Sequence, residues 1–227
     1  MRRTKIICTM GPATDNEDVL RDLMLNGMDV ARLNFSHGSH EEALERINRI
    51  KKVRDELNIP VAILLDTKGP EVRIKDFKEG KVELKEGQKF TLCTDDVVGD
   101  ENQVSITYAN LPNDVKVGSK ILIDDGLIEM EVISVKNSKI LCKVKNGGVV
   151  SNKKGVNVPN VALSMPYMSQ KDIDDILFGI EQDVDFIAAS FVRTANDIRE
   201  IKTLLRDNGG RDIRIIAKIE NAEGVDN

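Results

Sequence analysis

Five short apolar runs, each followed at once by polar or charged residues, limit what this chain can fold into. They lie at residues 5–8, 28–31, 61–65, 186–189 and 214–217. A strand of a parallel sheet that helices cover on both faces reads as a continuous apolar run. In folds built on such sheets, functional side chains follow the carboxyl ends of the strands. The pattern therefore predicts an α/β fold and, at the same time, the places where a site would lie.

Segments with helical period separate these runs, and each begins with a typical helix-start signal. Asp15 precedes the first segment, and pairs that resemble capping boxes precede the others: Ser39 with Glu42, Ser169 with Asp172, and Thr194 with Asp197. Outside the middle of the chain the order is strand, helix, strand, helix, strand, then strand, helix, strand. This alternation predicts parallel strands joined by right-handed crossovers.

The middle of the chain has a different pattern. Residues 81–85, 128–132 and 140–144 alternate between polar and apolar positions, and glycines punctuate the stretch between 72 and 158. A period of two with frequent glycines is typical of strands joined by turns. We therefore expect an all-β domain at 71–158, inserted between an α/β part at 1–70 and its continuation at 159–227.

Composition excludes several classes of protein. The 33 Lys and Arg are scattered among 38 Asp and Glu, and the net charge is -5, which argues against a nucleic-acid partner. The cysteines Cys8, Cys93 and Cys142 form no CxxC pair, so we expect neither disulfides nor a zinc site. No apolar run approaches the ~20 residues that a membrane span needs. We expect a cytoplasmic protein with no membrane or nucleic-acid partner.

The polar residues after the runs suit chemistry on an anionic, phosphorylated substrate. Guanidinium groups bind phosphate or carboxylate, and side-chain oxygens suit hard cations. Lys218 and Glu220 are two residues apart, which would place both side chains on the same face of a strand. A structural ion pair would explain these two residues equally well. His37 and His40 could indicate a metal site, although such residues more often mark the entry of a helix.

Five segments, taken in order, closely resemble pyruvate kinase. They read IICTMGPAT at 6–14, ARLNFSHG at 31–38, LDTKGPEVR at 65–73, KKGVNVP at 153–159 and AKIEN at 217–221. The resemblance implies a partial (β/α)8 TIM barrel of about five strands, with an inserted all-β barrel domain that closes as a lid. It also implies transfer of a phosphoryl group from phosphoenolpyruvate to ADP in glycolysis, giving pyruvate and ATP, with Mg2+ or Mn2+ and K+ as cofactors.

The resemblance also implies roles for individual residues. Arg32 would contact the transferring phosphoryl group, Lys218 would stabilise it in flight, and Glu220 would be one of two carboxylates that hold the divalent metal. The monovalent ion would be held by oxygens of Asn34, Ser36, Asp66 and Thr67, the last through its backbone carbonyl. The nucleotide would lie near Asn34, His37, Arg73 and Lys154. Glu71 matches the pattern expected of members that require K+.

The chain ends at Asn227, before the strand that carries the second metal carboxylate in that family. We therefore expect the 227 residues alone to be inactive, whereas the full-length enzyme is expected to be a homotetramer. Two alternatives remain. One is a different metal-dependent barrel that acts on phosphoenolpyruvate or pyruvate by carbon–carbon chemistry. The other is a non-catalytic chain that binds a nucleotide or pairs with other subunits.

Overall fold

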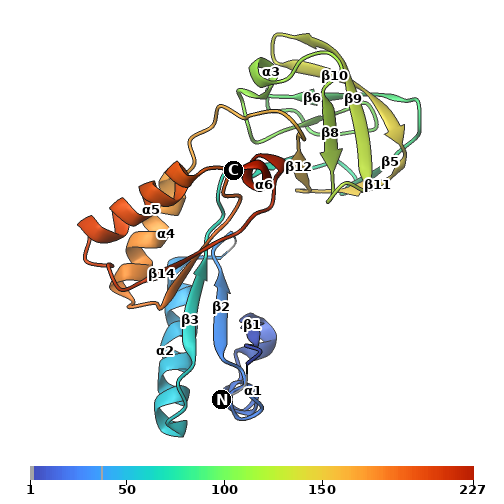
Figure 1. Ribbon diagram of the computed structural model, residues 1–227. Helices are drawn as coiled ribbons and strands as arrows, with labels where there is room; N and C mark the ends of the chain where they lie inside the picture. The colour runs from blue at the N-terminus through green and yellow to red at the C-terminus, as the bar shows by residue number, and fades with distance from the viewer. Residues whose placement is uncertain (1–2, 37) are drawn as a thin grey trace. The chain divides into compact units, whose positions relative to one another are not determined.

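The computed structural model describes residues 3–36 and 38–227 and divides them into two compact units. Unit 1 takes the chain up to Pro70 and again from Tyr167 onward, and unit 2 takes Glu71–Pro166. Unit 1 combines helices and parallel strands, whereas unit 2 is built almost entirely of strands (Figure 1). The chain thus leaves unit 1 once and returns to it once.

Unit 1 contains a sheet of five parallel strands in the order β1-β2-β3-β13-β14. The strands are β1 (Ile7–Thr9), β2 (Val30–Asn34), β3 (Ala62–Asp66), β13 (Phe186–Ala189) and β14 (Arg214–Ala217). The helices are η1 (Pro12–Thr14), α1 (Glu17–Leu25), α2 (His40–Leu57), α4 (Gln170–Glu181), α5 (Ala195–Asp207) and α6 (Ala222–Asp226). The predicted alternation of strands and helices is confirmed, and the sheet is part of a (β/α)8 barrel.

The helices begin where polar side chains can accept hydrogen bonds from their first backbone N–H groups. Ser169 and Thr194 form capping boxes with Asp172 and Asp197, as predicted, and Ser39 accepts from the backbone N–H of Glu42. The predicted start of α1 is wrong by one residue. Its cap is Asn16, because the Asp15 carboxylate instead accepts hydrogen bonds from Arg46 and Arg49.

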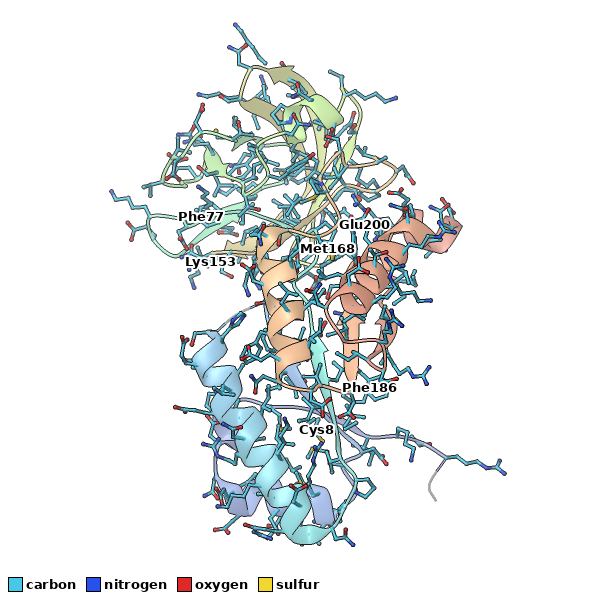
Figure 2. All side chains as sticks on the ribbon, turned by 90° about the vertical axis from the view of Figure 1, so that its left-hand side faces the viewer. Cys8, Phe77, Lys153, Met168, Phe186 and Glu200 are labelled. Atoms are coloured by element: carbon cyan, nitrogen blue, oxygen red, sulfur yellow. The ribbon has the colours of Figure 1, made fainter. Side chains whose placement is uncertain are left out.

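Helices α2, α4 and α5 line one face of this sheet (Figure 2). Their apolar side chains pack with the strands into a core that includes three fully buried isoleucines, Ile47, Ile63 and Ile187. The edge strands are different, because Ile7 on β1 is 51% exposed and Ile216 on β14 is 40% exposed. Unit 1 therefore has a well-packed centre and two open sheet edges.

Unit 2 has its own core and a sheet of seven strands in the order β4-β12-β8-β9-β10-β6-β7, with a separate pair β11-β5. The elements are β4 (Val72–Arg73), β5 (Lys81–Leu84), β6 (Lys89–Cys93), β7 (Gln103–Ser105), α3 (Leu111–Asp114), β8 (Lys120–Ile123), β9 (Ile128–Lys136), β10 (Lys139–Asn146), β11 (Gly148–Ser151) and β12 (Gly155–Asn157). The backbone N–H of Thr107 donates to Arg73 O at 2.8 Å, and that of Lys75 donates to Ser105 O at 2.7 Å. These bonds join the first and last strands of the sheet, so the sheet closes on itself as a barrel does.

Unit 2 extends to Pro166, whereas the sequence placed the return to the α/β part at residue 159. Val161, Leu163 and Met165 pack against the core of unit 2. Ser164 adds polar contacts, because its Oγ donates to Asp114 Oδ1 at 2.8 Å. The segment from Val161 to Met165 therefore belongs to unit 2, although it has no regular secondary structure. The sequence pattern changes at Val158, so it does not reveal this later boundary.

The cysteines Cys8, Cys93 and Cys142 are free thiols, and the last two are buried. Over residues 3–36 and 38–227, no helix combines the length and the hydropathy that crossing a bilayer requires.

Candidate functional site

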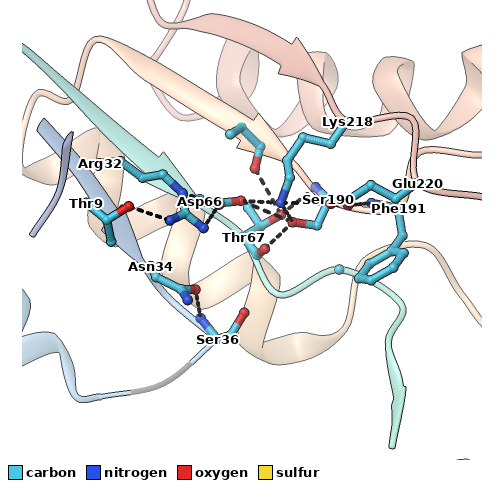
Figure 3. A network of polar contacts seen from close by, with 12 residues as sticks. Thr9, Arg32, Asn34, Ser36, Asp66, Thr67, Ser190, Phe191, Lys218 and Glu220 are labelled. Atoms are coloured by element: carbon cyan, nitrogen blue, oxygen red, sulfur yellow. Dashed lines mark hydrogen bonds and ion pairs between the residues drawn. The ribbon is translucent and has the colours of Figure 1, made fainter. Parts of the chain in front are cut away.

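The carboxylate of Asp66, at the end of β3, binds two cations from other strands. Arg32 on β2 donates from Nε to Oδ2 at 2.6 Å, and Lys218, just after β14, donates from Nζ to Oδ1 at 3.0 Å (Figure 3). The Asp66 side chain is only 3% exposed, while those of Arg32 and Lys218 are about one third exposed. A buried carboxylate thus positions two cations whose charged ends still reach solvent.

Ser190, directly after β13, joins this cluster. Lys218 Nζ donates to its Oγ at 2.9 Å, and the same Oγ lies 2.5 Å from Thr67 O and 3.1 Å from Asp66 Oδ1. Ser190 is 2% exposed. No role for this serine was predicted from the sequence. The signal that could have found it is its position, because it follows a buried parallel strand just as Thr67 follows β3.

Glu220 lies beside Lys218, with its Oε1 3.4 Å from the lysine Nζ. Its other oxygen accepts a 3.0 Å hydrogen bond from the backbone N–H of Phe191. Phe191 has φ 53°, a left-handed conformation that is rare for a bulky residue and often marks functional segments. The expectation that Lys218 and Glu220 share a strand face is wrong, because β14 ends at Ala217, but the two side chains do meet.

The predicted oxygen ligands of a monovalent ion fall into two pairs. Asn34 Oδ1 accepts from the backbone N–H of Ser36 at 3.0 Å, and Asn34 stands opposite Asp66 in the strand register. Thr67 follows Asp66, and its carbonyl accepts from Ser190. His37, which is predicted to lie near the nucleotide, is outside the described residues.

The two predicted nucleotide residues of unit 2 are each paired with a carboxylate of that unit. Arg73 Nη2 lies 2.5 Å from Glu71 Oε1, and its Nη1 donates to Lys153 O at 2.5 Å. Lys154 Nζ lies 2.9 Å from Asp124 Oδ1. Both cations are about one third exposed, so a ligand could reach them.

The side chains present fit hard cations, with one carboxylate for a divalent ion. Glu220 could serve as that carboxylate, and within the described ranges no group of three or more His, Cys, Asp or Glu side chains comes together. Mg2+ is commonly held by one or two carboxylates together with substrate phosphates, so Glu220 suits a shared ion. An ionised carboxylate offers about four lone-pair sites. Arg32 contacts Asp66 Oδ2 through both Nε and Nη2, and Lys218 contacts Oδ1, so a further ion could be coordinated only through Oδ1.

Tyr167 and Gly69 hold the backbone of Ser190 in place. The Tyr167 hydroxyl donates to Ser190 O at 3.0 Å, and burial raises the pKa of this tyrosine, which keeps the donor protonated. Gly69 has φ +66°, and a Cβ at this position would lie 2.6 Å from Ser190 O. The Gly69 backbone N–H in turn donates to the buried Asp172 at 2.9 Å. Only glycine allows this close approach of the two backbones.

Comparison with known proteins identifies the family. The family model described as "Pyruvate kinase, barrel domain" matches residues 1–227. Proteins named pyruvate kinase from Clostridium perfringens and Geobacillus stearothermophilus are 49% and 54% identical to this chain over 228 residues. All of this chain is covered, but it spans only 48% and 39% of those relatives, in their N-terminal part. The chain belongs to the pyruvate kinase family.

Proposed function

We propose that this chain supplies part of the active site of an enzyme that transfers a phosphoryl group from phosphoenolpyruvate to ADP. The bond from the enol oxygen to phosphorus breaks, a bond from a β-phosphate oxygen of ADP to phosphorus forms, and the enolate takes up a proton to give pyruvate. The observation that carries the proposal is the cluster of Arg32, Asp66, Ser190, Lys218 and Glu220 at the carboxyl ends of neighbouring parallel strands.

Phosphoryl transfer needs positioning and charge stabilisation more than it needs a protein nucleophile. The exposed ends of Arg32 and Lys218 supply positive charge for the oxygens of the moving group. Asp66 fixes where these charges lie, because it binds both of them from a buried position. Arg32 and Lys218 would thus share one task, to supply charge, and Asp66 would have another, to position them.

We also propose that metal ions bind at the carboxyl ends of the same strands. Glu220 would hold Mg2+ or Mn2+, and Asn34, Ser36, Asp66 and Thr67 would hold K+. These ions would supply further positive charge against the phosphate oxygens. In unit 2, Arg73 and Lys154 would bind phosphates of the nucleotide, since both are partly exposed cations.

A second candidate is a pairing function without catalysis, which the exposed apolar residues of the edge strands β1 and β14 favour. In that case the purified chain would bind a complementing C-terminal pyruvate kinase segment in size-exclusion chromatography, and the complex would show no turnover.

A chimeric enzyme tests the proposed catalytic function. In this chimera, residues 1–227 replace the matching segment of the Geobacillus stearothermophilus relative, which serves as the control. We expect pyruvate formation from phosphoenolpyruvate and ADP that depends on Mg2+ and K+, whereas the 227-residue chain alone should show no appreciable turnover. A folded chimera without activity would contradict the proposal.

A further inference from the structure

We propose that Ser190 is a positioning residue for Lys218. In this inference, which rests on the proposed function, the Ser190 hydroxyl holds the lysine ammonium where it meets the transferring phosphoryl group. Ser190 would not touch the substrate itself, and its effect on the rate would pass through the lysine.

The hydrogen bonds of the hydroxyl fix its orientation. A serine hydroxyl has one proton to donate and two lone pairs that accept. Thr67 O at 2.5 Å is closer to the Oγ than Asp66 Oδ1 at 3.1 Å, so the proton points to the Thr67 carbonyl. The lone pairs then face Lys218, whose Nζ lies 2.9 Å away.

The contacts of the ammonium differ in length. Two are short, 2.9 Å to Ser190 and 3.0 Å to Asp66, and one is longer, 3.4 Å to Glu220. The short contacts hold the nitrogen, and the long one is the contact that a substrate oxygen would most readily replace. Asp66 also binds Arg32, so of the two close acceptors Ser190 is the one that serves Lys218 without also binding the arginine.

Ser190 itself is held rigidly. It is 2% exposed, its backbone N–H donates to Thr67 Oγ1 at 3.2 Å, and its carbonyl accepts from Tyr167. A lysine side chain is long and flexible, so a fixed acceptor on a buried backbone limits where its charge can lie. Groups that orient the ligands of a metal ion typically change activity by roughly 10–100-fold when they are mutated, and we expect an effect at the low end of that range here.

The first test is a double-mutant cycle in the chimera. Ser190→Ala should lower kcat by about 10-fold and change KM for phosphoenolpyruvate by less than about 2-fold, because a contact that matters in the transition state is weakened. In the Lys218→Met background the same change should cause no further loss, since the group through which Ser190 acts is gone. Equal losses in both backgrounds would show a structural role and would overturn the inference.

The second test needs no activity and uses the 227-residue chain. In a chain labelled with 13C at the lysine ε-carbon, Lys218→Met assigns the Lys218 signal. When the Lys218 side chain is immobilised, its two ε-protons have different surroundings, and we expect two resolved 1H chemical shifts. In Ser190→Ala the side chain should move freely, and the two shifts should merge into one. Ser105→Ala is the matched control, because Ser105 is also fully buried but its hydroxyl bonds only backbone groups. This variant should leave the Lys218 signals unchanged.

The two tests separate the possible failures. An unchanged Lys218 signal in Ser190→Ala would overturn the positioning contact, whatever the chimera does. Merged signals together with an unchanged kcat would overturn its catalytic consequence. An inactive chimera would overturn the proposed function, and with it the catalytic part of this inference, while the NMR result would still decide whether Ser190 holds Lys218.

Discussion

Lys218 Nζ lies 3.0 Å from the Asp66 carboxylate, although the two residues are 152 positions apart in the chain. The contact exists because β13 lies between β3 and β14 and pairs in parallel with both, so that the carboxyl ends of the three strands lie at the same edge of the sheet. The same carboxylate binds Arg32, so one buried negative charge organises two positive ones.

Asp66→Asn should therefore disturb both cations. The amide keeps the shape of the side chain but loses its charge, and hydrogen bonds to a charged group contribute roughly 1.5–3 kcal/mol. We expect a loss of about 2 kcal/mol in the free energy of unfolding and a fall in kcat of more than about 10-fold, measured in the chimera. Asp207→Asn, which removes the exposed partner of Arg206, is the control and should change neither quantity. An Asp66→Asn enzyme with full turnover would argue against the organising role.

Gly69→Ala should harm the site more than a glycine substitution at an open position. Both Gly69 and Gly80 have positive φ, but a Cβ at 69 would lie 2.6 Å from Ser190 O, whereas a Cβ at 80 would meet nothing within 4 Å. Each alanine should lower the free energy of unfolding by roughly 1–2 kcal/mol, because a Cβ disfavours the left-handed backbone conformation. Only Gly69→Ala should also lower kcat, because it pushes on the backbone of Ser190. Similar kinetics for the two variants in the chimera would contradict this prediction.

Stability should fall at alkaline pH, in part because of Cys142. Burial raises the pKa of this thiol from 9.0 to about 12, so the folded chain keeps a proton that the unfolded chain releases. The stabilisation is present in full below pH 9 and is lost as the pH rises from 9 towards 12. The slope for one thiol is at most about 1.4 kcal/mol per pH unit. Urea unfolding at several pH values should show a shallower fall for Cys142→Ala; parallel curves would refute the assignment.

Asp172→Ala should destabilise unit 1 by about 2 kcal/mol, because the buried carboxylate completes the capping box of α4 with Ser169 and also accepts from Gly69. Asp197 is the matched comparison, since it caps α5 in the same way and accepts from the nearby backbone of Arg193 and Thr194. The two variants should lose similar stability, but only Asp172→Ala should lower kcat in the chimera. A loss of turnover in Asp197→Ala alone would contradict the link through Gly69.

The fold could be predicted largely from local patterns. Apolar runs and capping residues mark the strands and helices, and the period of two marks the inserted β domain, because these signals depend on neighbours in the chain. The error at Asp15 has the opposite origin. Its carboxylate pairs with Arg46 and Arg49 on α2, and a pattern of neighbouring residues cannot predict contacts between such distant positions.

The candidate site was predictable as a set of residues but not as an arrangement. The resemblance to pyruvate kinase predicted Arg32, Asp66, Lys218 and Glu220 as site residues, but it gave Asp66 only the role of a ligand of the monovalent ion. Its pairing with two cations depends on the strand order, which joins distant segments. Ser190 was missed for the same reason, because its partners come from β3 and from the segment after β14.

The most direct test of the catalytic proposal is the turnover of Lys218→Met in the chimera, beside Lys52→Met, whose lysine pairs with Glu17 on an exposed surface. Removing one electrostatic contact to a transition state typically costs roughly 10²–10³ in rate. We predict a fall of this size in kcat for Lys218→Met, with KM for phosphoenolpyruvate nearly unchanged and with full activity in Lys52→Met. A Lys218→Met enzyme that turns over as fast as its parent would contradict the proposed function of the cluster.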